Sequence, residues 1–340
     1  MIALTRRRVA GVLFTLLLVL LLVGFAALIV GPSALTPSDV VGALRGAEPG
    51  GAVADIVLRV RLPRVQLGML VGASLAIAGV LFQALLRNPL ADPFVLGVSG
   101  GAALGAILVL SLGASVGLGY AAVPPAAFAG SLCATVLLYV AAGFRGRVSA
   151  THLLLTGVVF NAFASAAIVF LASLAGLMEG ARIFMWLIGS LSASRADMAG
   201  WVALFLGIGL ACAVPLARSL NLLTLGEESA KQLGVEVERH RRILLVATSL
   251  MVGAAVSVSG LIGFVGLIIP HLLRLLLGSD HRLLIPAAGF AGAAFLVVCD
   301  TVARTLLLGR ELPVGAVTAV VGGPLFLYLL RRHQRRAFAQ

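Results

Sequence analysis

Charged residues are scarce in this chain of 340 residues. Asp, Glu, Lys and Arg make up 11% of it, whereas hydrophobic residues make up 61%. Soluble domains carry about 25% charged and roughly 45–50% apolar residues. A soluble fold of this composition would leave a large apolar surface in water, and a disordered chain needs a far more polar composition. The composition therefore excludes both classes and indicates an integral membrane protein.

Cysteine is rare, and the motifs for a P-loop and for a zinc protease are missing. The three cysteines, Cys133, Cys212 and Cys299, stand singly in apolar stretches. Single thiols in such stretches exclude a disulfide framework and are typical of small buried side chains. The sequence contains no GxxxxGK[ST] and no HExxH. We therefore expect no P-loop for ATP, no catalytic residues and no metal ligands in this chain.

Ionisable residues are also few within the apolar stretches. The clear case is Asp300 and Arg304, which are spaced i, i+4 and can pair on one helix face. A proton-coupled carrier usually needs ionisable groups near the middle of the membrane. We interpret this pair as structural or surface-facing. An ion- or proton-coupled secondary carrier is therefore the alternative function rather than the preferred one.

Long apolar stretches are abundant. A membrane span needs about 20 apolar residues to cross roughly 30 Å of hydrocarbon. The stretches predict an all-α integral membrane protein, a single domain over residues 1–340 with about ten transmembrane helices. The predicted spans are 9–30, 65–86, 94–112, 120–142, 151–173, 197–217, 241–259, 262–277, 284–306 and 313–330. The segment Ile183–Ser190 is apolar but too short to span, and it predicts a short helix at the membrane surface.

The basic residues indicate an orientation. When the N-terminus is placed inside, 17 of the 25 Lys and Arg residues fall in predicted inner segments and 8 at outer ends. An inner excess follows the positive-inside rule, so both termini are predicted to be cytoplasmic. The same distribution accounts for the net charge of +12 without a nucleic-acid partner.

An internal repeat is visible in two stretches of ten residues. Residues 71–80 read VGASLAIAGV, and residues 252–261 read VGAAVSVSGL. Five spans per half is an odd number, so a repeat would relate two inverted five-helix halves, as in many transporters. The alternative is a chance match between helices rich in Gly and Ala. Small residues such as Gly101 and Gly105 predict close packing between helices.

Three polar segments interrupt the apolar pattern. Arg87–Pro93 holds two prolines and an asparagine and predicts a tight turn. Leu223–Val235 predicts a short amphipathic helix that begins at Glu227 and ends at Gly234. The third segment is Gly263–Arg274, which is followed by Gly278–Arg282.

These segments resemble the permease subunits of type II ABC importers, the FecCD family that carries vitamin B12, haem and ferric siderophores. The resemblance extends from about residue 55 to 332 and includes Arg61–Arg64, Glu311–Gly315 and Gly323-Pro324 in the same order. It implies a non-enzymatic subunit of the bacterial cytoplasmic (inner) membrane that binds no cofactor itself. The implied cargo is a metal chelate, with a ferric siderophore as the first choice and cobalamin or haem as the others.

The resemblance also implies partners. The permease would form a homodimer, and two separate ATP-binding subunits would hold ATP and Mg on the cytoplasmic side. A periplasmic or lipid-anchored substrate-binding protein would dock on the outer side.

Site residues can be proposed by the same resemblance. The cytoplasmic coupling segment is 218–241, and the expected contacts with the ATP-binding subunit are Leu225, Gly226, Glu227, Ala230, Leu233 and Gly234. Docking of the binding protein is expected at Arg61, Arg64 and Arg304, with interfacial anchoring as the alternative for the first two.

The inner gate is expected in the loop before predicted span five, and spans five and ten are expected to line the pathway. The gate maps to Ser149, Ala150 and Thr151, and Asn161 is expected to line the pathway. A hydrogen bond from Asn161 to a neighbouring helix is an equal alternative. His271 belongs to the Pro-His-x-x-Arg turn of the family and is not interpreted as a haem ligand.

Overall fold

The structure is a computed structural model that describes residues 5–46, 50–113, 117–144, 147–148, 150–191, 198–307 and 310–337. These residues form an all-α bundle whose strands are confined to one hairpin of two strands, each two residues long: β1 (Gly143–Phe144) and β2 (Arg147–Val148). Short helical segments are η1 (Ile56–Arg61), a π-helix, and η3 (Tyr120–Ala122). The α-helices are α1 (Arg6–Ile29), α2 (Pro37–Leu44), α3 (Ala52–Asp55), α4 (Leu62–Leu85), α5 (Val98–Leu112), α6 (Val123–Ala142), α7 (Ala150–Leu174), α8 (Leu177–Ile188), α9 (Ala199–Ala213), α10 (Ala217–Leu223), α11 (Glu227–Gln232), α12 (Val237–Ser259), α13 (Val265–Leu277), α14 (His281–Thr305) and α15 (Val314–Ala337).

A helix occupies each of the ten predicted spans. By length and composition, six helices of the described residues can cross a membrane, or seven if α9 and α10, bent by 60° at a short break, count as one span. The helices α5 and α13 and the apolar part of α15 are shorter. Ten complete crossings therefore stay a prediction. The apolar segment near Ile183 lies in α8, a helix of 12 residues.

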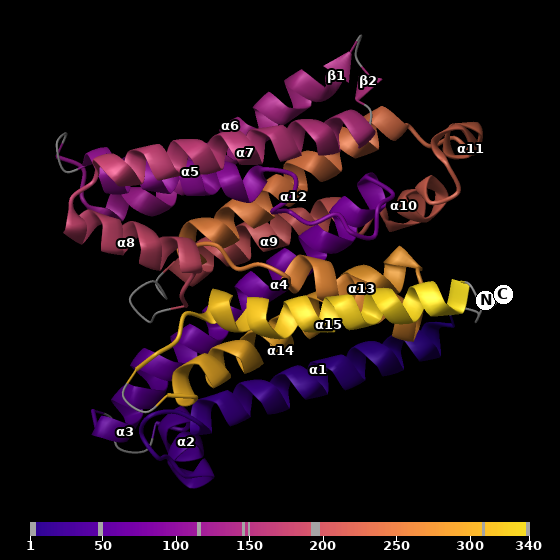
Figure 1. Cartoon of the computed structure of the whole chain (residues 1–340). Helices are drawn as coiled ribbons and strands as arrows, with labels where there is room; N and C mark the ends of the chain where they lie inside the picture. Colours follow the sequence, from indigo (N-terminus) through magenta and orange to yellow (C-terminus); the bar gives the residue numbers. More distant parts are fainter. Residues whose placement is uncertain are drawn as a thin grey trace.

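The helix ends gather in two groups at opposite ends of the bundle (Figure 1). The start of α1 and the end of α15 lie at the end that also carries α10 and α11, whereas α2 and α3 lie at the other end. The local sequence determines where α2 begins: Thr36 and Asp39 form a capping box, and Pro37 stands in the first turn.

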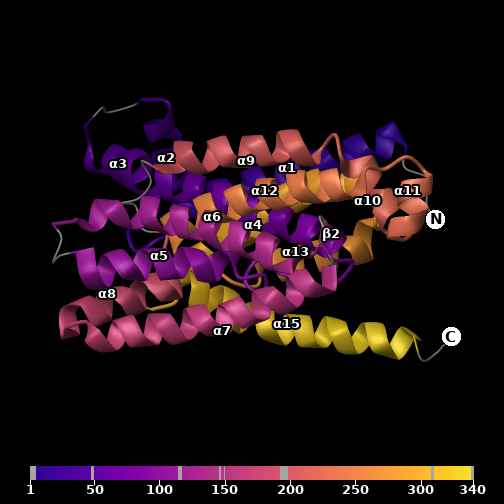
Figure 2. The same cartoon turned by 90° about the horizontal axis from the view of Figure 1, so that it is seen from above.

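The helix α4 is the centre of the bundle. It packs against α14, α12, α13 and α9, and 83% of its most apolar stretch is buried, compared with 17% for α1. Viewed from above, α7 and α15 lie along one side, while α1 and α9 lie along the opposite side (Figure 2).

The contacts between helices agree with the predicted inverted repeat, because a helix pair in one half has an equivalent pair in the other. If α1, α4, α5, α6 and α7 correspond to α9, α12, α13, α14 and α15, then the pair α4–α14 corresponds to α12–α6, and both pairs are in contact. Gly72 and Gly253 occupy the same place in the two ten-residue stretches. Gly72 packs against Gly292 of α14, and Gly253 packs against Ser131 of α6. The inverted repeat stays a prediction, and this correspondence favours it over a chance match.

Glycine allows the closest of these contacts. A Cβ atom on Gly72 would overlap the carbonyl group of Gly292, and one on Gly292 would overlap Ala76 and the carbonyl oxygen of Gly72. Gly101 and Gly105 of α5 contact α6 around Gly130 in the same way. In lipid, helices gain little from the hydrophobic effect and associate through such close packing.

A pair of matched substitutions tests this packing. We expect Gly72→Ala to lower the unfolding temperature of the purified protein in detergent, because overpacking costs about 1–3 kcal/mol. Gly207→Ala on α9 is the control, since its Cβ would meet no atom within 4 Å. Alanine favours a helix over glycine by about 1 kcal/mol, so the control should keep or raise the unfolding temperature. Equal shifts in the two variants would contradict the close contact.

Candidate functional site

The segment between α9 and α12 forms a connector at one end of the bundle, which we define as α10, Thr224–Gly226, α11 and Leu233–Glu236 (Figure 1). Gly226 has φ +117° and ψ 152°, a conformation that is essentially restricted to glycine. Gly234 has φ +83°, and the amide of Val235 donates to the carbonyl of Ala230, which closes α11. Backbone geometry at two glycines therefore fixes the direction of this short helix.

Ion pairs attach α11 to the helices beside it. Glu227 Oε1 lies 2.6 Å from Arg241 Nη2 of α12 and 3.4 Å from Arg87 Nη2, which follows α4. Arg241 Nη1 also lies 3.0 Å from Glu238 Oε1. The side chain of Arg241 is 5% exposed, so its pairs are shielded from water and are stronger than surface pairs. The predicted residue Glu227 thus holds the connector in place, and its carboxylate is already paired within the chain.

The other predicted coupling residues divide into two groups. Leu225 and Leu233 flank α11 and are 65% and 59% exposed, which leaves apolar surface available to a partner. Ala230 is 0% exposed, because it packs α11 against the body of the protein. The expectation that Ala230 contacts a partner therefore does not fit its position.

A second attachment joins α10 to the start of α14. Asn221 Nδ2 donates to Asp280 Oδ1 at 2.9 Å, and Asn221 Oδ1 accepts from the backbone amide of His281 at 2.9 Å. Asp280 also accepts hydrogen bonds from Arg282, and these bonds lower the pKa of its carboxyl group. The sequence prediction missed Asn221. The signal for it is an amide side chain in a largely apolar helix, opposite the polar Gly278–Arg282 turn.

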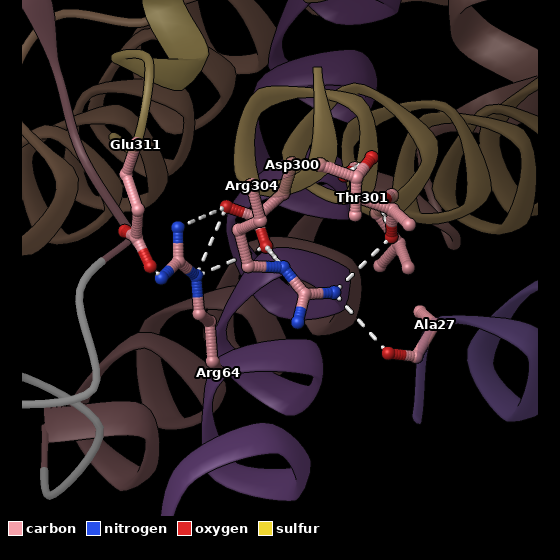
Figure 3. A network of polar contacts seen from close by, with 8 residues as sticks. Ala27, Arg64, Asp300, Thr301, Arg304 and Glu311 are labelled. Carbon is pink, nitrogen blue, oxygen red and sulfur yellow. Dashed lines mark hydrogen bonds and ion pairs between the residues drawn. The ribbon is translucent and has the colours of Figure 1, made fainter. Parts of the chain in front are cut away.

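At the opposite end, four charged side chains form a network between α4, α14 and the segment before α15 (Figure 3). Arg64 Nη2 lies 2.9 Å from Asp300 Oδ1, and Arg304 Nε lies 3.2 Å from Asp300 Oδ2. Arg64 Nη1 also pairs with Glu311 Oε2 at 2.8 Å. The predicted i, i+4 pair of Asp300 and Arg304 is confirmed, and it is structural rather than surface-facing. Glu311 is the member that reaches the surface, with a half-exposed side chain.

The three arginines expected at a docking surface are buried: Arg61, Arg64 and Arg304 are 3%, 6% and 5% exposed. Arg61 donates to the carbonyls of Leu28 and Ile29, each at 2.7 Å, and to Ser33 at 2.6 Å. These bonds satisfy carbonyls at the end of α1, which have no partner within the helix. The prediction of exposed docking arginines therefore does not fit this structure, because their donors face the chain itself.

The predicted gate and pathway residues are placed only in part. Ala150 and Thr151 begin α7, and Ser149 lies outside the described residues. Asn161 Nδ2 donates to the carbonyls of Phe94 and Val95. Phe94 and Val95 lie in the turn before α5, so Asn161 bonds to a neighbouring turn rather than to a helix, and its place on the pathway stays a prediction. Among the described residues, no group of three or more His, Cys, Asp or Glu side chains could hold a metal ion.

Comparison with known proteins gives the family. The sequence profile of the FecCD transport family matches residues 17–332. The chain belongs to the FecCD transport family. Among its relatives is the cobalamin import system permease protein of Halobacterium salinarum, 46% identical over 282 residues, which cover 83% of this chain and 75% of the relative. The hemin transport system permease protein of Yersinia pestis is 39% identical and covers 84% and 86% of the two chains.

A solved structure described as an inward-facing conformation of a putative metal-chelate type ABC transporter is also similar. Its TM-score is 0.83 at 30% identity, and the match covers 95% of this chain and 99% of that one. The FecCD chain is thus the permease subunit of an ABC importer, a membrane protein with several spans that is not itself an enzyme.

The buried network of this FecCD protein can be tested by removing one charge. We expect Asp300→Asn to destabilise the chain by about 3–5 kcal/mol, because it leaves Arg304 buried without its carboxylate. Asp55→Asn is the control: it breaks the exposed pair with Arg59, and such pairs contribute about 0–1 kcal/mol. Unfolding in mixed micelles measures both variants.

A double variant separates the effect of the unmatched charge of Arg304 from the effect of the changed side chain at Asp300. Asp300→Asn with Arg304→Met should recover part of the lost stability, since the unmatched charge is gone. If Asp300→Asn unfolds like the wild type, the network does not stabilise the bundle.

Proposed function

We propose that two copies of this chain form the translocation pathway of an ATP-driven importer of metal chelates, and that two ATP-binding subunits dock on the connector. The observation that carries the proposal is the form of the connector. It presents Leu225 and Leu233 to the outside, while Ala230 and the Glu227–Arg241 pair fix its base. ATP and Mg would be bound by the docked subunits.

The attachments of the connector suggest how motion is transmitted. Glu227 joins α11 to α12, and Asn221 joins α10 to α14. Both α12 and α14 pack on α4. A docked subunit that displaces the connector would therefore move the central helices as a body, and access to the pathway would alternate between the two membrane faces.

The homodimer is proposed from the family resemblance and from the exposed apolar residues on one side of the bundle. α7 and α15 share that side (Figure 2) and expose large apolar residues, including Phe163 at 61% and Val320 at 74%. A second copy packed against this side would cover these residues and place both chains around a shared pathway.

The outer binding protein is proposed to dock at the end that carries α2 and α3. There, Arg61, Arg64 and Arg304 act indirectly by holding the chain in shape. Among the described residues, the exposed basic side chains at this end include Arg45, Arg59 and Arg310. They are the candidates for direct pairing with an acidic surface, and such pairs steer association.

In this orientation the connector and both ends of the chain face the cytoplasm of a bacterial cell.

The cargo is proposed to be a tetrapyrrole-type chelate. The relatives at 46% and 39% identity are named for cobalamin and hemin, and this favours them over the ferric siderophore expected from the sequence. With its binding protein and ATP-binding subunits in proteoliposomes, the chain should accumulate cyanocobalamin or hemin. Uptake of a ferric siderophore alone would overturn this choice.

Coupling through the connector can be tested at Gly226. We expect Gly226→Val, in the full complex reconstituted in proteoliposomes, to lower the cargo transported per ATP hydrolysed while hydrolysis continues. A side chain at φ +117° costs about 1–3 kcal/mol, so α11 should change direction. A clash of the new Cβ does not add to this effect, because its nearest atom is Ser229 Oγ at 3.9 Å.

Gly117→Val is the matched control. Gly117 has φ +74° and open space around it, but it lies between α5 and η3, away from the connector. Gly117→Val should strain the backbone as Gly226→Val does, but it should leave the coupling of transport to ATP hydrolysis unchanged. Normal transport per ATP in Gly226→Val would reject the connector as the coupling element, and so would equal losses in both variants.

A further inference from the structure

A groove runs between α1 and α13 at the end of the bundle that carries the connector. Its volume is about 450 Å³. Apolar side chains line most of it: Val12 and Leu16 come from α1, and Leu273, Leu276 and Leu277 come from α13. Among the described residues that line it, Arg8 is the only ionisable one. The groove is thus apolar along its length and carries one positive charge, that of Arg8.

The groove exists because α1 and α13 both pack on α14 but hardly on each other. Gly11 keeps it open, since it lines the groove and a Cβ there would meet no atom within 4 Å. The other polar lining residue, Thr15, donates its hydroxyl to the carbonyl of Gly11 at 2.9 Å. This hydroxyl therefore already has an acceptor within the helix, and Arg8 is the polar group left to receive a ligand.

The charge around Arg8 is strongly positive. Arg6, Arg7 and Arg8 are consecutive, and the first turn of α1 contains no acidic residue. None of the three forms a salt bridge with a residue that the structure describes. The acidic residue that follows α13, Asp280, is matched by Arg282 at 2.5 Å. A ligand at Arg8 would therefore meet an uncompensated positive field.

The outer face of α1 indicates what surrounds the groove. Phe14, Leu18, Leu21 and Leu22 are all exposed, as expected of a helix that faces lipid. Arg8 lies within the first turn of α1, at the end of the bundle that carries the connector. The ligand must therefore come from lipid and combine a long apolar part with a negative group at the depth of the headgroups. Basic clusters at the cytoplasmic ends of membrane helices attract anionic lipids in this way.

We propose that this groove is a binding site for one anionic phospholipid of the cytoplasmic leaflet. One acyl chain lies between α1 and α13 against Leu16 and Leu273, and the phosphate group pairs with Arg8. The bound lipid fills the space between two helices that are each anchored to α14. The site does not depend on the connector or on the identity of the cargo.

Native mass spectrometry of the purified full chain, with added phosphatidylglycerol or phosphatidylcholine, tests the proposal. The wild type should retain one phosphatidylglycerol in preference to phosphatidylcholine. Arg8→Gln should weaken retention of phosphatidylglycerol about fivefold, the effect of about one basic side chain near a membrane surface, and leave phosphatidylcholine unchanged. Arg331→Gln is the matched control, because it removes one exposed arginine from α15, which does not line the groove.

A second variant tests the groove itself. Gly11→Phe would place a large side chain at the groove and should lower retention of both lipids, whereas Gly207→Phe should not; a Cβ at either position meets no atom within 4 Å. Equal lipid preference in Arg8→Gln and Arg331→Gln would overturn the proposal, as would unchanged retention in Gly11→Phe. Displacement of the lipid by inorganic phosphate at the same concentration would also overturn it, because a free anion site would then explain the basic cluster.

Discussion

Close backbone contact between α4 and its neighbours is the constraint on which the rest of the structure depends. A Cβ on Gly72 would overlap Gly292 of α14, and a Cβ on Gly79 would overlap Gly266 of α13. In a membrane the solvent is as apolar as the side chains, so a bundle gains stability from contact area between helices rather than from leaving water. Glycine gives the shortest distance between helix axes and therefore the largest contact. Both ends of the protein, with their different polar sites, are held relative to each other by this central contact.

Charge is used sparingly because each buried ion must be matched. Asp300 forms ion pairs with both Arg64 and Arg304, and Glu311 pairs with Arg64, so the network of two acids and two bases is neutral. A buried pair is weak support for stability, but removing one partner is costly. Such a network therefore favours one arrangement of α4, α14 and the segment before α15 over others. Arg61 adds to this by satisfying the carbonyls at the end of α1.

The sequence alone could predict the helices and the pair Asp300–Arg304, since both depend on local patterns: apolar runs of sufficient length and a spacing of four residues. It could also predict the helix at Glu227 and its end near Gly234. Hydropathy and family motifs do not report which way a side chain points, however. Arg61 and Arg64 stand in a polar motif near a helix end, where exposure is the ordinary expectation.

The partners of these polar side chains are distant in sequence. Asn221 meets Asp280 across 59 residues, and Arg64 meets Asp300 across 236. Such pairs form only once the helices have packed, so they could not be predicted from spacing. Ala230 shows the same limit, because a small residue suits both a close external contact and a tight internal one.

The two attachments of the connector lead to different helices, and this has a mechanical consequence. If α11 were tied only to α12, a displaced connector could tilt that helix alone. Asn221 also ties α10 to the start of α14, and α12 and α14 meet on α4, so a displacement must move all three or break a buried contact. Packed cores switch between discrete arrangements rather than deform continuously. The hinges of any such motion must then lie outside α4, α12 and α14. The side formed by α7 and α15 is the place for them, because large apolar residues are exposed there and fewer helix contacts resist movement.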